Sequence, residues 1–525
     1  MQIETIEMIK KLMEDKSSIR AVRNYRTSYS PKNKERTRLW LEKTVLGLAN
    51  LLAGTRIILK TLGSSCLKIR KAKDLEMATH TISSRKNRST GKLDPLLDIC
   101  NKEVHSVLGV GVKIDVIIKE EELIIYKELS FEMFNGINKT EFWNDDLKKF
   151  RVVSLFGGGG AMTAGFVNTQ ACESVMAVDS DIPEQNPYDY QLKGKAATYT
   201  SWVVETFKKN FPKSFFYWGD IRSINPIYIP RADIVLVSAP CIEYSGLGLQ
   251  MKGLIEHFAS HIVRIILETG AFAVFFENVP QYFKSQVFKT IKDMLSEVFP
   301  EQSYTERNSY DDSAIESRNR GYFVAFRDKT NFEFPEHPKV PNSRRKKVKH
   351  FLDDESTVKW RPIEGTVMNS FLTTHKEKFK NTGFTADSNK MLVSTNDNKV
   401  SCFVKGYGKI QSVCSYLRHP SDEKLWRPFT PNEIKRMMNY PKWFEFPEHM
   451  PMTSQYEVLG NSVNVISVEA IASRIVSALM SYKIKMQMRK QKELEKLSEI
   501  KSEIKKELSR LANLKAKKTG CLFCS

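Results

Sequence analysis

The stretch RVVSLFGGGGAMTAGF, residues 151–166, decides the fold class of this 525-residue chain. A short apolar run leads into four consecutive glycines, and a helix-forming segment follows them. Such a strand–turn–helix unit is typical of a nucleotide-type site, because glycines accept positive φ angles and let the backbone approach a ligand. A tight strand-to-helix connection explains the turn nearly as well. The lack of a Gly-Lys-Ser/Thr sequence disfavours a phosphate-cradling loop.

Strand-like and helix-length segments alternate around this turn, from about residue 149 to 329. The strand-like runs are short, β-branched or aromatic, and they read RVVSLF, SVMAVD, ADIVLVSA, AFAVFFENV and GYFVAF. Helical spacing appears between them in ATYTSWVVETFKKNF and SHIVRIILETG. Near-continuous apolar strands that alternate with helices predict an α/β fold, a Rossmann-like, doubly wound and mostly parallel sheet.

The rest of the chain divides into four parts. Residues 1–148 begin with a helical segment and continue with short alternating runs (TRIILKTL, CLKIRKA, VKIDVII, ELIIYKEL), which predict a β-rich accessory domain of unknown role. Residues 330–425 are basic, proline-containing and loop-rich, as expected of a smaller inserted domain. Residues 426–481 should return to the sheet, with Thr430 as N-cap, Pro431 at N1 and Glu433 at N3 of a helix.

The tail, residues 482–525, has the pattern of one amphipathic helix. Apolar residues recur at spacings of three and four among many lysines, at Leu494, Leu497, Ile500, Ile504, Leu508, Leu511 and Leu514. This spacing fits a helix that packs on the body or pairs with another chain. A solvated helix with a frayed end fits it equally well.

The amino-acid composition and net charge of the chain limit the classes of function that it can have. The chain has 41% hydrophobic and 27% charged residues and a formal net charge of +20, which favours a polyanionic partner or simply a basic soluble protein. No apolar run reaches eighteen residues and no secretory signal is evident, so we expect no membrane span and a cytoplasmic location. The eight cysteines form no disulfide framework, and the Cys521/Cys524 pair alone makes no metal site.

Two aspartates follow predicted strands and are candidates for an adenosine pocket. Asp179 in SVMAVDSD lies about twenty residues beyond the glycines, where an acidic residue accepts hydrogen bonds from ribose hydroxyls. Asp220 in YWGDI ends another strand, where a carboxylate can receive an adenine amino group. Either residue alone could simply cap a helix or turn.

A cysteine emerges from the buried run ADIVLVSA. Cys241 follows Pro240 in APCIEYSGLGLQMKG, a loop that cannot continue the strand. A small buried residue is the commoner role of such a cysteine. At the carboxyl edge of a parallel sheet, however, ligands bind, and a thiol there can act as a nucleophile if its pKa is lowered or a general base assists it.

A carboxylate and two arginines complete the set of candidates. Glu277 follows the apolar run AFAVFF at the same sheet edge, where burial favours its protonated form and makes proton donation feasible. Arg318 and Arg320 precede GYFVAF, and alternate residues of an extended chain point to one side, so both guanidinium groups can converge on one target. That target could be a base, a phosphate or Glu277. A structural carboxylate and surface arginines are the alternatives.

Taken in order, these segments resemble the cytosine-5 DNA methyltransferase family over about residues 150–480. LFGGGGAMTAGF is similar to its FxGxG cofactor turn, VDSD and GDI to its ribose and adenine segments, and APCIEYSGLG to its Pro-Cys loop. FENVP, RNR, WRPFTPNEIKRMMNYP and LGNSVNVISVEAIA resemble four further motifs. The resemblance implies a class I methyltransferase sheet and a target-recognition domain at 330–425. It implies catalytic roles for Cys241, Glu277, Arg318 and Arg320, and cofactor-binding roles for Phe156, Gly158, Gly160, Asp179, Asp220, Pro240 and Asn461.

The sequence departs from the family pattern at four positions. Ser154 stands where an acidic residue is common, Ile242 where glutamine follows the cysteine, Glu316 where glutamine is frequent, and Asp179 where glutamate is usual. None of these changes removes a catalytic group. They concern loop geometry and base contacts.

The resemblance implies methyl transfer from S-adenosyl-L-methionine to C5 of a cytosine flipped out of duplex DNA, through a covalent adduct of Cys241 at C6. Glu277 would protonate or hydrogen-bond N3, and the arginines would hold the base. The alternatives are an RNA cytosine-5 methyltransferase, an inactive DNA-binding homologue and, last, a small-molecule enzyme. The basic insert favours DNA, and the intact catalytic set favours activity. A cognate restriction enzyme and self-association through the tail are further expectations.

Overall fold

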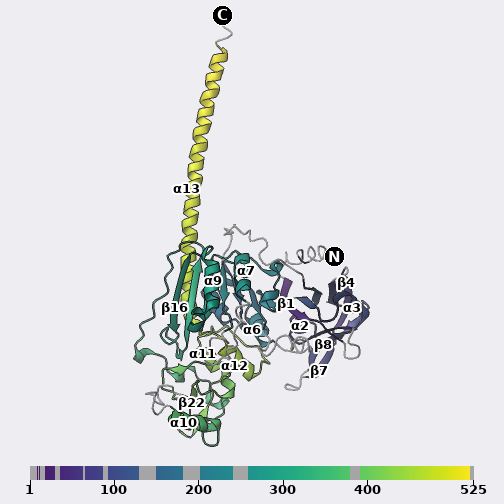
Figure 1. Cartoon of the computed structure of the whole chain (residues 1–525), viewed down its shortest axis with the longest axis vertical. Coiled ribbons are helices and arrows are strands. Elements are labelled where there is room, and N and C mark those ends of the chain that lie inside the picture. The colour runs from purple at the N-terminus through teal and green to yellow at the C-terminus, as the bar shows by residue number, and fades with distance from the viewer. Residues whose placement is uncertain are drawn as a thin grey trace.

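The computed structural model describes residues 18–29, 36–62, 66–86, 93–128, 149–180, 201–240, 258–378 and 391–520, together with Ile9 and Lys11. A broad central sheet runs through the body, a smaller unit containing β22 and α10 lies at one end, and a long helix, α13, projects from the other (Figure 1).

Within the described residues, one sheet contains 13 strands. In spatial order they are β16 (Glu301–Asn308), β18 (Asn319–Phe326), β15 (Ala273–Asn278), β14 (Ile234–Val237), β11 (Phe150–Leu155), β12 (Cys172–Asp179), β13 (Phe215–Trp218), β1 (Ile19–Arg26), β9 (Lys113–Lys119), β10 (Glu122–Lys127), β5 (Cys66–Lys71), β4 (Arg56–Leu62) and β6 (His80–Thr81).

The six strands from β15 to β1 run parallel, and the remaining neighbours are antiparallel. The predicted parallel sheet therefore forms the centre. The sheet as a whole is mixed, because antiparallel strands extend both of its sides.

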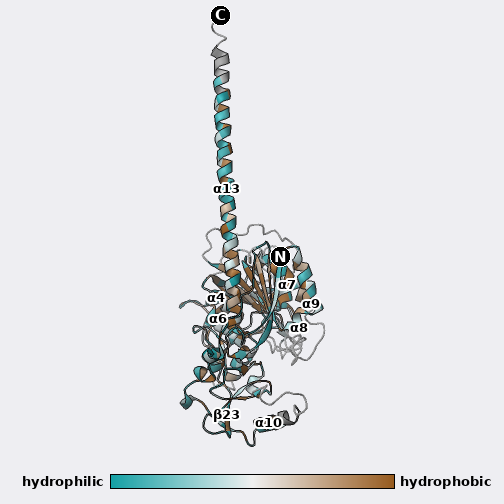
Figure 2. Cartoon of the chain, turned by 90° about the vertical axis from the view of Figure 1, so that its left-hand side faces the viewer, coloured by the Kyte–Doolittle hydropathy of each residue, from teal (hydrophilic) through white to brown (hydrophobic). Residues whose placement is uncertain are grey.

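Helices cover both faces of the central strands (Figure 2). Successive residues of β14 alternate between two buried clusters, Ile234 and Leu236 facing one and Val235 and Val237 the other, as the period of two in a strand requires. The helices of the first face are α4 (Ala161–Asn168), α6 (Trp202–Asn210) and the start of α13 (Val465–Gly520), and those of the second are α7 (Ala259–Thr269), α8 (Pro280–Phe283) and α9 (Gln286–Ser296).

Six of the N-terminal strands belong to the central sheet and do not form a sheet of their own. The four runs predicted as strands correspond to β4, β5, β9 and β10, but β1 pairs in parallel with β13 and so joins them to the central sheet. A second sheet of β2 (Ser28–Tyr29), β3 (Thr37–Glu42), β8 (Leu93–Ile99) and β7 (Ser83–Lys86) lies beside them, with α2 (Thr44–Leu48) and α3 (Lys102–Leu108). The sequence pattern predicts the strands but not their partner.

The junction between β1 and β13 is held by polar as well as backbone contacts. The guanidinium carbon of Arg23 lies 3.9 Å from the centre of the Trp218 ring, and Arg23 Nη1 donates to the Trp218 carbonyl at 3.2 Å. Thr44 Oγ1 donates to Glu205 Oε1 at 2.7 Å. The N-terminal strands are thus tied to the turn after β13 and to α6.

The inserted region is loop-rich, as predicted. Its main feature is a sheet of four short strands, β19 (Arg361–Pro362), β23 (Leu425–Arg427), β22 (Tyr416–Arg418) and β20 (Leu392–Val393). Other elements are the pair β17 (Glu316–Ser317) and β21 (Val400–Ser401), helix α10 (Val367–Lys378) and the short 3-10 helices η6 (Asn342–Arg344), η7 (Val348–Phe351), η8 (Glu355–Thr357) and η9 (Tyr407–Lys409).

The C-terminal part contains α11 (Pro431–Met437), α12 (Met452–Gly460) and α13. The predicted cap of α11 is confirmed: Thr430 accepts from the backbone of Glu433, and Glu433 accepts from Thr430 in return. Residues 465–520, predicted as two segments, form one helix, because neither proline nor glycine interrupts 465–519.

Helix α13 is also the one described helix that is long and apolar enough to cross a membrane by length and composition. Its apolar first part packs on α4 inside the body, as the core helix of a globular protein does, so this is weak evidence for a span.

A buried carboxylate at the β1–β9 junction makes stability depend on pH. Asp115 Oδ1 accepts from Asn24 Nδ2 at 2.7 Å, and Asp115 Oδ2 accepts from the Tyr228 hydroxyl at 3.1 Å. Burial raises the pKa of Asp115 to about 7, although the Asn24 hydrogen bond acts in the opposite sense. The folded protein therefore keeps a proton that the unfolded chain has already lost, and stability falls as pH rises through this range.

We expect the free energy of unfolding to fall by roughly 2–3 kcal/mol more for the wild type than for Asp115→Asn between about pH 5 and pH 8. The amide of the variant has no charge to bury, so its stability should not follow this titration. Urea unfolding at a series of pH values measures the difference. Parallel pH curves for the two proteins would contradict the assignment.

Candidate active site

The carboxyl ends of four of the parallel strands are joined by hydrogen bonds, which bring most of the predicted site residues to one edge. Gly219 N donates to the Asp179 carbonyl at 3.0 Å, and Gly157 N donates to the Val178 carbonyl at 3.0 Å. Ser238 N donates to the Leu155 carbonyl at 3.2 Å. The turns after β13, β12, β11 and β14 therefore lie in sequence along the edge, where ligands bind in folds of this type.

The glycine-rich turn after β11 has the backbone conformation that its sequence predicts. Gly158 and Gly160 have φ angles of 52° and 96°. At Gly160, the N-cap of α4, an added Cβ would lie 2.6 Å from the Phe211 ring, so no larger residue fits. Gly158 N donates to Asp179 Oδ2 at 2.9 Å, which joins the turn to the carboxylate predicted for ribose. Phe156, half-buried, packs edge-on against Phe258 at 5.8 Å.

The departure at Ser154 has a local explanation. Its side chain is fully buried, and its hydroxyl lies 2.8 Å from the Thr163 hydroxyl on α4. The strand and the helix that flank the turn are thus joined by a neutral hydrogen bond. Serine avoids the cost of burying a charge at this position.

Asp220 lies after β13 and is bound by a neighbour. The Arg222 side chain donates to it through Nε at 3.0 Å and Nη2 at 2.6 Å, and the Arg222 backbone donates at 2.9 Å. Burial acts to raise the pKa of Asp220, but the hydrogen bonds and charge of Arg222 outweigh it and hold the pKa below its ordinary value. The carboxylate is therefore charged at neutral pH and can accept from an amino group. In this structure it faces Arg222.

Glu277, at the end of β15, is buried between a hydroxyl and a guanidinium group. Ser238 Oγ donates to Glu277 Oε2 at 3.0 Å, and Arg320 Nε lies 3.1 Å from Glu277 Oε1. Of the three targets that the sequence left open for the arginine pair, Arg320 contacts Glu277. Both contacts fix the orientation of the carboxylate at the edge of the sheet.

Asn278 joins Glu277 to the loop that carries the predicted nucleophile. Its side-chain amide donates to the Ala239 carbonyl at 2.9 Å, immediately before Pro240. Pro240 is the last described residue before this loop, so Cys241 and the departure at Ile242 lie outside the described residues. The fold nevertheless places the chain directly before Cys241 beside Glu277. Sequence reasoning assigned no role to Ser238 or Asn278.

Arg318 does not share the target of Arg320, and the prediction that both converge is wrong. Its buried guanidinium donates through Nη1 to the Phe403 carbonyl at 2.8 Å and through Nη2 to the Gly460 carbonyl at 3.1 Å. Nη2 also donates to the Ser462 carbonyl. Because β17 ends at Ser317 and β18 begins at Asn319, Arg318 lies between two strands and turns toward these backbone groups.

Glu316 explains how this guanidinium is tolerated. The fully buried Glu316 Oε1 lies 3.4 Å from Arg318 Nη1 and accepts from Phe403 N at 3.1 Å, while Oε2 accepts from Asn464 Nδ2 at 3.0 Å. Carboxylate and guanidinium thus neutralise each other.

Asn461, predicted to bind cofactor, is exposed at the C-cap of α12. The buried asparagine of this segment is Asn464.

The residues at the edge fit an adenosyl group. The backbone at Gly158 has open space beside it, since an added Cβ would meet nothing within 4 Å. Half-buried carboxylates lie on one side of this turn, Asp179 at the end of β12 and Asp220 after β13, and the Phe156 ring supplies an apolar surface. A sugar with vicinal hydroxyls and a base with an amino group need acceptors and apolar contact of this kind.

Comparisons with known proteins show the family of the chain. Residues 150–477 match the family model described as C-5 cytosine-specific DNA methylase, and the chain belongs to that family. It is therefore a DNA (cytosine-5-)-methyltransferase. The Type II methyltransferase M.HaeII of Haemophilus aegyptius is 25% identical over 341 residues, which cover 63% of this chain and 95% of that protein.

A second relative and one solved structure cover a similar share of this chain. The Type II methyltransferase M1.ScrFI of Lactococcus lactis subsp. cremoris is 26% identical over 359 residues, covering 65% of this chain and 82% of the relative. Among solved structures, the Entamoeba histolytica methyltransferase EhMeth aligns with a TM-score of 0.46 and 18% identity, covering 63% of this chain and 99% of that one.

Removal of the Arg318 guanidinium should be strongly destabilising. Arg318→Met leaves the buried Glu316 carboxylate without its counter-charge, and we expect a loss of about 3–5 kcal/mol in the free energy of unfolding. The double variant Glu316→Gln/Arg318→Met removes both charges and should recover part of that loss. Urea unfolding followed by tryptophan fluorescence measures each variant.

The exposed Arg344 supplies the control, because Arg344→Met should change stability by less than about 0.5 kcal/mol. Equal losses in Arg318→Met and the double variant would show that the charge pair is not the cause.

Proposed function

We propose that the enzyme uses S-adenosyl-L-methionine to methylate a flipped cytosine in duplex DNA through a covalent Cys241 adduct. The observation that carries this proposal is the contact set around Glu277. Ser238 and Arg320 hold the carboxylate, and Asn278 ties the same strand end to Ala239, two residues before Cys241.

The cofactor would lie over the glycine turn. S-adenosyl-L-methionine, when bound, supplies an electrophilic methyl group on a sulfonium sulfur. Gly158 and Gly160 let the backbone approach it, Asp179 would accept from the ribose hydroxyls, and Asp220 would accept from the adenine amino group after Arg222 shifts. Phe156 and Pro240 would line the pocket, and Asn461 would close it from the C-terminal side.

Cytosine C5 is a poor nucleophile, so the protein must activate the ring first. The Cys241 thiolate would add to C6, while Glu277 donates a proton or hydrogen bond to N3, which leaves C5 as an enamine carbon. After methyl transfer, loss of the C5 proton and elimination of the Cys241 thiolate would restore the aromatic ring. The C6–S bond thus forms and breaks once in each turnover.

Arg320 and Arg318 would support this step differently. Arg320 contacts Glu277 directly, so it would hold the carboxylate and the base together. Arg318 is buried among backbone carbonyls, so it would act as a positioning residue. It would hold the segments that contain Phe403 and Gly460 against the catalytic sheet.

The DNA contacts are proposed from charge and topology. Residues 330–425 would form the target-recognition domain, where Arg344, Lys346 and Lys349 are exposed and available for phosphates. A stacked base hides C5, so extrusion of the cytosine into the site is required. The net charge of +20 suits a duplex better than a small neutral substrate.

The cellular setting is proposed from the relatives. Those reported above are described as Type II methyltransferases, which supports a role beside a cognate restriction enzyme. We infer a cytoplasmic, nucleoid-associated enzyme of a bacterial or archaeal cell. Self-association through the C-terminal helix would be independent of this catalytic role.

The Cys241→Ser variant tests the nucleophile. We expect methyl transfer to fall by more than about 1,000-fold, because a hydroxyl is a far weaker nucleophile than a thiolate. DNA and cofactor binding should be retained. Transfer of labelled methyl groups to duplex DNA gives the rate, and bisulfite sequencing identifies the methylated site.

Parallel reactions with transfer RNA distinguish the RNA alternative, and the wild type should prefer duplex DNA. A wild-type protein that binds DNA without methyl transfer would instead indicate an inactive homologue. A near-normal rate for Cys241→Ser would remove the thiol from the mechanism.

Asp179→Asn tests the cofactor site. Loss of the charged acceptor should weaken S-adenosyl-L-methionine binding by about 10–100-fold, as expected for a hydrogen bond to a charged group. The rate at saturating cofactor should change little. Isothermal titration calorimetry gives the affinity, and Glu173→Gln, at an exposed position of the same strand, is the matched control. Unchanged affinity in Asp179→Asn would contradict the ribose assignment.

A further inference from the structure

Helix α13 leaves the body of the protein and continues far beyond it (Figure 1). Its first part is buried as far as Leu479, whereas the residues from Glu493 onward whose burial is described are exposed. Six large apolar side chains on this free part are 51–61% exposed: Leu494, Leu497, Ile500, Ile504, Leu508 and Leu511. Isolated exposed leucines are common, but a row of six is not.

The six side chains form one stripe. Because an α-helix turns by about 100° per residue, they fall within about 120° of its circumference. Within the stripe, Leu497 and Leu508 are related by an eleven-residue spacing, and Ile500 and Leu511 are related by the same spacing. An eleven-residue repeat keeps a stripe nearly straight along a helix, so it can face one partner over its whole length.

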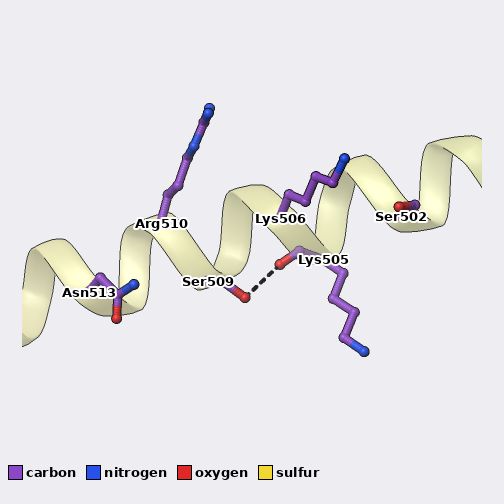
Figure 3. A pocket seen from close by; sticks show the side chains of 6 residues that line it. All are labelled: Ser502, Lys505, Lys506, Ser509, Arg510 and Asn513. Atoms are coloured by element: carbon purple, nitrogen blue, oxygen red, sulfur yellow. Dashed lines mark hydrogen bonds between the residues drawn. The ribbon is translucent and has the colours of Figure 1, made fainter.

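The rest of the circumference is polar. Figure 3 shows the side chains of Ser502, Lys505, Lys506, Ser509, Arg510 and Asn513 on this helix, and the rotation of about 100° per residue places them outside the stripe. The Ser509 hydroxyl donates to the Lys505 carbonyl of the same helix at 2.9 Å. The helix therefore has one apolar side for association and a solvated remainder.

Charge indicates the kind of partner. Between residues 493 and 511 the chain has five glutamates and five lysines or arginines, so this stretch is neutral although the whole chain carries +20. The positive excess of this helix lies before the stripe, in residues 483–492, which contain five lysines or arginines and no acidic residue. A stripe that bound DNA or an anionic membrane would itself carry a positive excess. A neutral stripe flanked by both signs is compatible with an identical helix.

We propose that the stripe pairs with the same stripe of a second copy of this chain, so that two enzymes associate through a coiled coil. Six half-exposed side chains from each helix give an interface near the roughly 1,000 Å² below which specific association is uncommon. The pair is therefore weak, with a dissociation constant in the micromolar range. This proposal does not rest on the catalytic assignments.

The test uses the full-length protein in sedimentation velocity from about 1 to 100 µM. We expect a concentration-dependent dimer for the wild type. Ile504→Gln/Leu508→Gln should weaken it by about 100-fold or more, because four apolar side chains leave the interface. Ser502→Gln/Ser509→Gln, on the polar side of the same turns, is the matched control and should dimerise as the wild type does.

Circular dichroism checks that both variants keep their helix content, and methyl transfer to DNA by the monomeric variant shows that the catalytic site is intact. A wild type that stays monomeric at about 100 µM, or a stripe variant that dimerises like the control, would overturn the proposal. So would a stripe whose substitution abolishes binding to anionic vesicles or duplex DNA while leaving the oligomeric state unchanged.

Discussion

The buried ion pair of Arg318 and Glu316 is the constraint on which the arrangement of the protein depends. The guanidinium cannot reach water, so backbone carbonyls at Phe403, Gly460 and Ser462 must come to it. Those three groups belong to the inserted region and to the end of α12. One side chain at the start of β18 thereby fixes the position of two chain segments that are distant in sequence. The inserted region and the C-terminal part are thereby held against the central sheet.

Hydrogen bonds between neighbouring chain segments also fix the side chains at the carboxyl edge of the sheet. Parallel strands bring their carboxyl ends together, but the side-chain positions depend on short bonds between neighbouring turns. Gly158 binds Asp179, Ser238 binds Glu277, and Asn278 binds Ala239. Each bond joins two turns that follow different strands. Ser238 N also donates to the Leu155 carbonyl, so the groups proposed for the cofactor and for the base are held by one connected set of hydrogen bonds.

Local features of this structure could be predicted from the sequence, and long-range ones could not. The strand runs, the glycine turn and the cap at Thr430, Pro431 and Glu433 are encoded in neighbouring residues, and the structure has them. The placement of Glu277 at the sheet edge follows from strand polarity. The role of Arg318 depends on groups 85 to 144 residues away, and no local spacing reveals them. Strand patterns likewise identified β4, β5, β9 and β10 without indicating that β1 would join them to β13.

The parallel pairing of β1 with β13 also has a consequence for how the chain is assembled. The two strands are joined by contacts that span 195 residues, as between Arg23 and Trp218. The pairings among β1, β9, β10, β5 and β4 all lie within residues 19–127, so they require no later part of the chain. The other edge of β1 can pair only after β13, residues 215–218, has been synthesised. The N-terminal strands can therefore form first and offer the free edge of β1 to the central parallel strands, which pair with it later.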